Sequence, residues 1–342
     1  MKRVKSSNWT WVLAALISVG LLTFGCGKES KSPVAPQKTE FEILQPAADA
    51  YTGSTQPPVV SAQTVFDNIN DGNPANDYFI LSVRKPEDYA KGHIPGAINI
   101  FWRDIGKAEN IAKLPKDKKI AVYCYTGHTG AVATTLLNVM GYEAYDIKWG
   151  IMAWTKDQTA RVQNAFSEDV DAHDFTVETK INTVTKTYDL PNPDYTASTD
   201  ETEILQAACD YVATHMTPVT TAQALFDNLN DGNPANDPII VSVRKPEHYA
   251  LGHIPGAINI YWRDIAKEEN LKKLDPSKDI VVYCYTGHTG EISATVLNML
   301  GYKATNLKFG IMAWTKDPTV RVQSAFSETV DAHEFPLETG TH

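Results

Sequence analysis

The sequence predicts an α/β protein of two tandem domains, each a mostly parallel sheet with helices on both faces. Three observations lead to this prediction. The chain has 342 residues, which exceeds the usual size of one domain. Residues 61–180 align without gaps on residues 221–340, and about two thirds of the aligned residues are identical. Within each copy, short apolar strands alternate with helices, as in a parallel sheet covered on both faces.

The elements of the first copy follow one another in a regular order. Apolar residues at helical spacing predict a helix over 62–70, and a second apolar helix is expected over 131–140, ending at Gly141. Short apolar runs predict strands over 77–83, 97–100, 118–124 and 143–149. The second copy repeats this order, so the same fold is expected twice.

Composition and charge exclude some classes of partner. The apolar content of 43% is ordinary for a protein that buries a core. The formal net charge of −10 is spread along the chain without a basic block. This distribution argues against nucleic acid, and against anionic lipid bound through charge, as the main partner.

The first 26 residues are typical of an export signal. Three basic residues precede an apolar run, Trp11–Phe24, that is too short for a membrane span. The end of this run, "LLTFGC", resembles the lipobox of bacterial lipoproteins, which implies lipidation of Cys26. Gly25 fits that pattern, whereas Thr23 and Phe24 depart from it. A secretory signal with an incidental cysteine, or an uncleaved anchor, is the alternative.

These features divide the chain into segments and predict its location. We expect a lipoprotein-type signal peptide over 1–26, a flexible tether over 27–41, a first domain over 42–178, a linker over 179–202 and a second domain over 203–342. The expected location is the periplasm or cell envelope, with a lipid anchor in a membrane. Gly27, directly after the lipidated cysteine, favours the outer membrane in a Gram-negative organism.

The cysteines are few and their number constrains their pairing. Apart from Cys26, the chain contains Cys124, Cys209 and Cys284, so at least one thiol is unpaired within the chain. Cys124 and Cys284 occupy equivalent places in the two copies, and a free thiol at each is the simpler arrangement. Cys209 falls in a predicted helix and is interpreted as a buried, structural residue.

The stretch "VYCYTGHTG" occurs at 122–130 and again, unchanged, at 282–290. In each copy the cysteine ends a predicted strand and precedes a helix, the place where parallel sheets hold ligands. Gly127 and Gly130 allow the main chain to curl so that amides point at the sulfur, and the helix adds its positive end. Such surroundings favour a thiolate nucleophile. A buried cysteine in a strand-to-helix turn is the alternative.

Three motifs of each copy resemble the rhodanese domain. In the first copy they are "SVRKPEDYAKGHIPGAINI" at 82–100, the cysteine loop, and "WGIMAW" at 149–154, and the second copy repeats all three. The resemblance implies a rhodanese-like fold and sulfur transfer through a cysteine persulfide. It makes Cys124 and Cys284 the nucleophiles. It assigns the binding loops to Tyr125, Thr126, Gly127, His128, Thr129 and Gly130, and to Tyr285, Thr286, Gly287, His288, Thr289 and Gly290.

Departures from the family pattern narrow the chemistry. Related phosphatases carry an arginine where this chain has Gly130 and Gly290, so phosphate-ester chemistry is not expected. Ser82 and Ser242 stand where many members have aspartate. The cysteine loops also lack the basic residue that many thiosulfate-using members carry. Polysulfide or a persulfide is therefore at least as plausible a donor as thiosulfate.

Several polar residues near these motifs leave two roles open. His128 and His288 can assist proton transfer to the leaving sulfur, or they can point to solvent. Arg84 and Arg244 can reach the mouth of the site, or they can pair with neighbouring carboxylates. His173 and His333, in the repeated "VDAHDF" and "VDAHEF", are interpreted as surface helix ends.

The sequence as a whole predicts an exported sulfurtransferase with two intact cysteine sites. A donor would load each cysteine with sulfane sulfur, and a thiol, sulfite or cyanide-like acceptor would remove it. No metal and no organic cofactor is expected. The alternatives are a sulfur or selenium carrier lipoprotein of an envelope assembly that does not turn over, and a purely structural anchor protein.

Overall fold

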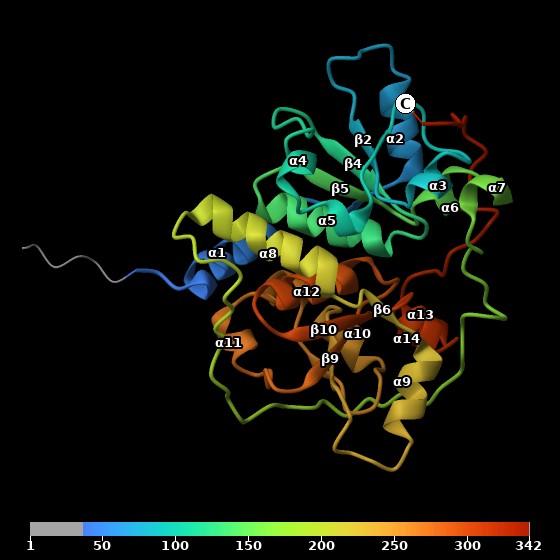
Figure 1. Cartoon of the computed structure of the whole chain (residues 1–342). Helices are drawn as coiled ribbons and strands as arrows, with labels where there is room; N and C mark the ends of the chain where they lie inside the picture. The colour runs from blue at the N-terminus through green and yellow to red at the C-terminus, as the bar shows by residue number, and fades with distance from the viewer. Residues whose placement is uncertain (1–36, 342) are drawn as a thin grey trace, which may run out of the picture. The chain divides into compact units, whose positions relative to one another are not determined.

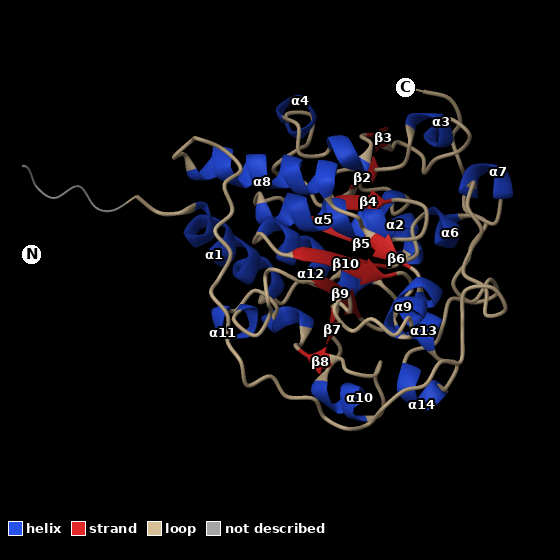
Figure 2. Cartoon of the chain, turned by 60° about the horizontal axis from the view of Figure 1, so that its bottom comes forward, coloured by secondary structure: helices blue, strands red, loops and turns tan. Residues whose placement is uncertain are grey.

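The framework consists of two five-stranded, entirely parallel sheets, one from each repeat (Figure 2). The strand order is β1-β5-β4-β2-β3 in the first and β6-β10-β9-β7-β8 in the second. The strands of the first are β1 (Val59–Val60), β2 (Phe79–Ser82), β3 (Ile98–Asn99), β4 (Ile120–Tyr123) and β5 (Ala144–Ile147). Those of the second are β6 (Val219–Thr220), β7 (Ile239–Ser242), β8 (Ile258–Asn259), β9 (Asp279–Tyr283) and β10 (Lys303–Leu307). The predicted fold class is confirmed.

This computed structural model describes residues 37–341. The predicted signal peptide, Cys26 and most of the predicted tether lie outside the described residues. Among those described, no helix has both the length and the hydropathy that crossing a membrane requires. The predicted domain boundaries stay predictions, although both repeats belong to one compact unit, Lys38–His342.

Helices surround both sheets. Those that belong to the first repeat are α1 (Glu40–Thr52), α2 (Ala62–Ile69), α3 (Pro86–Tyr89), η1 (Trp102–Asp104), α4 (Ala108–Ile111), α5 (His128–Val139), α6 (Ile151–Trp154) and α7 (Gln158–Arg161). Those of the second are α8 (Glu201–His215), α9 (Ala222–Leu229), α10 (Pro246–Ala250), η2 (Trp262–Asp264), α11 (Glu268–Leu271), α12 (His288–Met299), α13 (Ile311–Trp314) and α14 (Pro318–Arg321). Sequence periodicity located α2 and α5, but the one-turn helices are too short for it to detect.

Helices α1, α5, α8 and α12 lie between the two sheets (Figure 1). Their apolar side chains form one continuous core with the sheet faces that they cover, and this core contains Cys124, Cys209 and Cys284. The two helices that follow the repeated cysteines, α5 and α12, pack directly against each other. Since each sheet buries one face against this shared layer, neither repeat completes its core alone.

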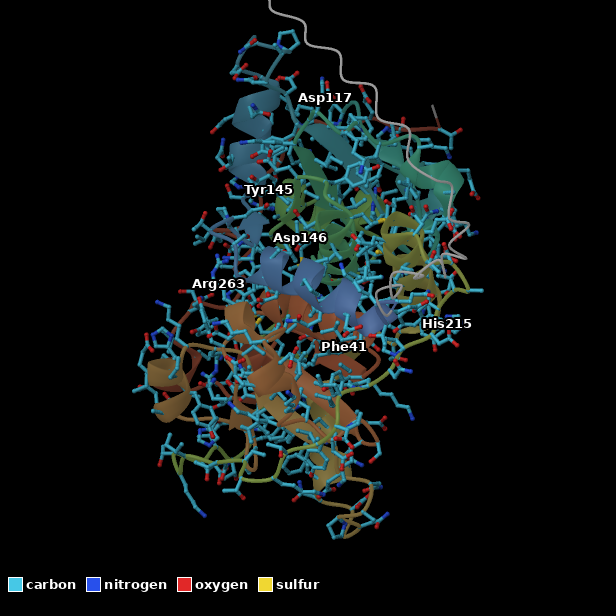
Figure 3. All side chains as sticks on the ribbon, turned by 90° about the vertical axis from the view of Figure 1, so that its left-hand side faces the viewer. Phe41, Asp117, Tyr145, Asp146, His215 and Arg263 are labelled. Atoms are coloured by element: carbon cyan, nitrogen blue, oxygen red, sulfur yellow. The ribbon has the colours of Figure 1, made fainter. Side chains whose placement is uncertain are left out.

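The helix that precedes each repeat is bound by the other repeat. Arg103 of the first repeat donates to the carbonyls of Ala213 and Thr214, at 3.0 and 2.8 Å, near the end of α8. Its counterpart Arg263, labelled in Figure 3, donates to the carbonyl of Thr52 at the end of α1, at 3.2 Å. These bonds satisfy carbonyls that a helix end leaves without partners.

The segment that follows each repeat also crosses to the other repeat. The first crossing segment, residues 163–182, runs along the second repeat, where the amide of Phe175 donates to Trp314 O at 3.0 Å. The second crossing segment, residues 323–340, runs back along the first repeat, where the amide of Phe335 donates to Trp154 O at 3.1 Å. Figure 1 shows these segments in yellow-green and red.

The crossing segments correct one interpretation from the sequence. His173 and His333 lie in extended stretches of these segments rather than at helix ends, and their rings stack on Phe175 and Phe335. The repeated "VDAHDF" and "VDAHEF" motifs stand out in the sequence, but they do not reveal that each one packs against the other repeat.

We expect Phe335→Ala to lower the free energy of unfolding by about 2 kcal/mol. The substitution removes a ring that stacks on Phe66 at 4.0 Å and meets Trp154 at 5.1 Å. Chemical denaturation monitored by circular dichroism measures the change.

Val330→Ala is the control, since Val330 lies in the same segment and is 75% exposed. The expected loss for this control is within about 0.5 kcal/mol. Equal stabilities of the two variants would show that the second crossing segment does not support the first repeat.

Candidate functional site

Each repeated cysteine directly follows the central strand of its sheet. Cys124 comes after β4 and Cys284 after β9, and a helix begins four residues later in each case. The amide of Gly127 donates to Sγ of Cys124 at 3.1 Å, and the amide of Gly287 donates to Sγ of Cys284 at the same distance. Both thiols are free in the structure, which is the arrangement that the sequence made simpler. Both are also buried, with 1% of each residue exposed.

Glycines give the loop its shape. Gly127 has φ +92°, in the left-handed region that side chains disfavour, and this turn directs its amide at the sulfur. Gly130 lies within the first turn of α5, where a Cβ would overlap the carboxyl group of Asp146. An arginine at this place, as in the related phosphatases, would displace Asp146. Gly127 thus shapes the turn, whereas Gly130 allows the close approach of Asp146.

The charge state of Cys124 differs from the expectation. Burial, followed by the negative charge of Asp146, raises the pKa of the Cys124 thiol above its ordinary value. Hydrogen bonds from the Thr129 hydroxyl and from the amides of Gly130 and Thr126 act in the opposite direction but do not outweigh burial. The loop therefore contains hydrogen-bond donors that can stabilise a thiolate, as expected, but the burial of the sulfur favours the protonated thiol.

Asp146 is a site residue that sequence reasoning missed. It lies on β5, is fully buried and is labelled in Figure 3. Neither of its carboxyl oxygens has a hydrogen-bond partner among residues 37–341. Burial and the nearby Glu291 raise the pKa of Asp146 well above its usual value, and burial does the same for Glu291. Both acids therefore lose their protons only at a higher pH than exposed carboxyl groups do.

The second site replaces this acid with an amide. Asn306 stands where the first repeat has Asp146, and it donates to Gly287 O and to Glu291, both at 3.0 Å. Glu291 in turn stands where the first repeat has Ala131. Comparing the two copies position by position for exchanged polar residues would have found this difference, which an identity count conceals.

The loop histidines face the other repeat. Nε2 of His128 accepts a hydrogen bond from the amide of Phe309 at 3.0 Å, and Nε2 of His288 accepts one from the amide of Trp149 at 3.1 Å. Burial lowers the pKa of His128 to about 3 and that of His288 well below its usual value. The alternative of a solvent-facing histidine is therefore wrong.

The second ring nitrogen of each histidine is also engaged. Nδ1 of His128 lies 2.9 Å from the Thr126 hydroxyl, and Nδ1 of His288 lies 3.2 Å from that of Thr286. Because Nε2 accepts an amide proton, the neutral ring carries its own proton on Nδ1. Proton transfer to a leaving sulfur would require these bonds to break.

The tyrosine after each cysteine marks another difference between the sites. The hydroxyl of Tyr125 donates to Asp88 at 2.5 Å, and Asp88 also pairs with Lys91. The hydroxyl of Tyr285 instead lies 2.6 Å from Nδ1 of His248. A carboxylate therefore borders the first site where an imidazole borders the second, so the two sites are not electrostatically equivalent.

The arginines of the "VR" motif are fully buried. Arg84 donates to the carbonyl of Ala160 at 2.7 Å, and Arg244 donates to the carbonyl of Val320 at 2.8 Å. Apart from one bond from Nε of Arg244 to the Ser242 hydroxyl at 3.3 Å, their hydrogen bonds go to main-chain carbonyls rather than to the carboxylates considered from the sequence. A contact between either arginine and substrate stays a prediction.

The remaining loop residues lie around the same two cysteines. Thr289 and Gly290 lie in the first turn of α12 in the second copy, and a Cβ on Gly290 would overlap Asn306. Among residues 37–341, no group of three or more histidine, cysteine or acidic side chains is placed to hold a metal ion. Each sulfur accepts a main-chain amide, and Cys124 has further amide and hydroxyl donors beside it.

Comparison with known proteins identifies a matching family. A model described as the rhodanese-like domain matches residues 61–157 and 221–317, together more than half of the chain. A putative thiosulfate sulfurtransferase 2 of Mycobacterium bovis is 25% identical over 267 residues, which are 68% of this chain and 75% of the relative. A probable adenylyltransferase/sulfurtransferase, MoeZ, of Mycobacterium tuberculosis is 29% identical over 135 residues. That match covers 38% of this chain and only 33% of MoeZ.

Solved structures also align with this chain. A thiosulfate sulfurtransferase from Pseudomonas aeruginosa aligns with 85% of this chain and 48% of its own, at 15% identity and a TM-score of 0.28. A rhodanese-related protein from Thermoplasma volcanium aligns with 28% of this chain and 89% of its own, at 30% identity and a TM-score of 0.25.

We expect Asp146→Asn to lower the pKa of the Cys124 thiol. The substitution removes a negative charge that opposes ionisation, so alkylation of Cys124 by iodoacetamide becomes several-fold faster between about pH 7 and 10. Mass spectrometry of the peptides separates Cys124 from Cys209 and Cys284.

The second repeat offers the converse variant. Asn306→Asp places a carboxylate at the corresponding position and should slow alkylation of Cys284. Unchanged or slower alkylation of Cys124 in the Asp146→Asn protein would contradict the assigned influence of this acid.

Proposed function

The chain belongs to the rhodanese-like domain family, and on that premise we propose that it is an exported sulfurtransferase with two cysteine sites. The family and its sulfurtransferase relatives support sulfur transfer as the general chemistry. The observation that carries the proposal is the same in both repeats: a free thiol at the end of the central strand accepts a main-chain amide proton at 3.1 Å.

The proposed cycle has two halves. A cysteine thiolate attacks the outer sulfur of a donor, a new S–S bond forms, and the donor's own bond to that sulfur breaks with its electron pair leaving on the donor remnant. The persulfide anion then rests among the loop donors. An acceptor nucleophile attacks the outer sulfur, and the cysteine leaves as a thiolate. Sulfite, cyanide or a thiol can accept in this way.

The charges of the site favour donors that are not dianions. The cysteine loops contain no lysine or arginine, and the loop histidines are held neutral by burial. Arg84 and Arg244 are bonded to carbonyls of their own repeats. An alkyl persulfide or an organic polysulfide, which carries at most one negative charge where thiosulfate carries two, is therefore the proposed donor class.

The burial of both sulfurs favours a second candidate. With only 1% of each cysteine exposed, a donor or acceptor reaches the sulfur only when the loop opens. A sulfur or selenium carrier, which loads once and delivers to a docked partner, requires such protection more than a fast enzyme does. Discharge by small acceptors distinguishes the enzyme from the carrier.

The place of action is proposed from the N-terminal sequence. The signal-like first 26 residues and the lipobox-like "LLTFGC" support export and attachment to a membrane through Cys26. Donors and acceptors would then be those of the periplasm or cell envelope, with the outer membrane favoured by Gly27.

We expect the protein to gain about 32 Da, one sulfur atom, on Cys124 and on Cys284 after exposure to polysulfide. Cys124→Ser and Cys284→Ser should each retain one adduct, and the double variant should have neither adduct nor transfer activity above background. Peptide mass spectrometry before and after addition of sulfite or cyanide reports loading and discharge.

Transfer by the double variant at the parental rate would exclude the persulfide cycle. An adduct that forms but persists in the presence of every small acceptor would favour the carrier over the enzyme.

We expect Cys26→Ala to abolish attachment to the membrane when the full chain is produced in a bacterial host. The parental protein should partition with the membrane fraction and carry a lipid at its new N-terminus, as read by intact mass. Partitioning of Cys26→Ala identical to the parental protein would support the uncleaved anchor instead.

A further inference from the structure

The two cysteine loops meet at the boundary between the repeats. His128 begins α5 and His288 begins α12, and their rings lie nearly parallel with centroids 6.3 Å apart. Both histidines are buried, with 5% and 4% exposed. The loops of the two sites therefore touch through these rings.

Each ring supports a strained turn of the other repeat. His288 accepts a hydrogen bond from the amide of Trp149, and His128 accepts one from the amide of Phe309. These two bulky residues have φ values of 67° and 63°, a region that such side chains rarely adopt. The surroundings must hold these turns in place, and the imidazole is the acceptor for their amides.

The supported turn is joined to the cysteine of its own repeat. After Trp149 and Gly150, the amide of Ile151 donates to the carbonyl of Cys124 at 2.9 Å, and a Cβ on Gly150 would collide with that carbonyl. In the second repeat, Ile311 makes the same bond to Cys284. A displaced turn would consequently displace the cysteine.

The same ring also lies against the glycine that binds the sulfur. A Cβ on Gly127 would overlap Nε2 of His288, and one on Gly287 would overlap Nε2 of His128. Gly127 is the residue whose amide donates to Sγ of Cys124. His288 thus contacts the site of Cys124 on two sides, and His128 contacts the site of Cys284 in the same way.

We propose that each loop histidine is a positioning residue for the cysteine of the other repeat, His288 for Cys124 and His128 for Cys284. The inference rests on the proposed function, since it concerns the same two sites. It makes the two sites interdependent: neither loop keeps its donor geometry unless the other loop is in place. The roles considered from the sequence placed each histidine at its own cysteine instead.

The charged groups around the rings are few. Asp146 has one carboxyl oxygen 3.8 Å from Nε2 of His288, and Lys148 and Lys308 are close enough to lower the pKa values of His288 and His128 respectively. None of these groups replaces the ring as an acceptor for the Trp149 amide.

The test uses the full chain with Cys284→Ser, in which Cys124 is the only remaining repeated cysteine. His288 then lies in the loop of the inactive site. Adding His288→Ala should reduce sulfur transfer through Cys124 about tenfold, as expected when a buried amide loses its acceptor. Alkylation of Cys124 by iodoacetamide at fixed pH should slow as well, since the Gly127 donor shifts. Cys124→Ser with His128→Ala is the mirror experiment on Cys284.

Two further variants make the outcome decisive. His288→Gln provides a carbonyl that can accept the Trp149 amide, and it should restore most of the loss. His215→Ala, which removes an exposed histidine of α8, should leave Cys124 unchanged. If His288→Ala prevents folding, as judged by circular dichroism, the rate of sulfur transfer through Cys124 in the His288→Gln variant tests the inference on its own.

Equal rates for Cys284→Ser with and without His288→Ala would overturn the inference. So would equal losses in the Ala and Gln variants, because a side-chain carbonyl able to accept the Trp149 amide proton would then restore nothing. If Cys284→Ser itself transfers no sulfur, the proposed function fails at this site, but the alkylation rate of Cys124 still tests the positioning.

Discussion

Two of the hydrogen bonds between the repeats, from the amides of Phe309 and Trp149 to His128 and His288, constrain much of the structure. They fix both rings as neutral acceptors and determine which ring nitrogen carries the proton. They also require α5 and α12 to begin side by side, which places the shared apolar layer between the sheets. The duplicated sequence therefore produces two cysteine loops that contact each other through their histidines.

Burial is the physical cost of this arrangement. Packing the loops against each other removes both sulfurs from solvent and raises the pKa of the Cys124 thiol. The hydrogen-bond donors around the sulfur are placed to stabilise an anion. They therefore bind most strongly when the sulfur is a thiolate or carries a persulfide. Reactivity then depends on opening at the boundary, where the contacts between the repeats are polar as well as apolar.

The repeats have kept the donors and changed the charges. Gly127 and Gly287 present the same amide to sulfur, whereas Asp146 is exchanged for Asn306 and Asp88 for His248. The first site thus has a buried carboxyl group on β5, whereas the second has an amide there that is hydrogen-bonded to the buried Glu291.

Sequence reasoning predicted the features that depend on local pattern. The strand expected over 118–124 is β4, and the helix expected over 131–140 is most of α5, because apolar runs and spacing are properties of neighbouring residues. The partners of His128 and Phe335 were not predicted, since they lie in the other repeat. Asp146 was missed although its exchange in the aligned copy was visible.

The tautomer of the loop histidines tests the central claim most directly. In protein labelled with ¹⁵N at histidine, two-bond ¹H–¹⁵N correlations show which ring nitrogen is protonated. The account predicts that His128 and His288 stay neutral between about pH 5 and 8, with the proton on Nδ1 and a bare Nε2. Rings that take up a second proton in this range, or that carry their proton on Nε2, would contradict it.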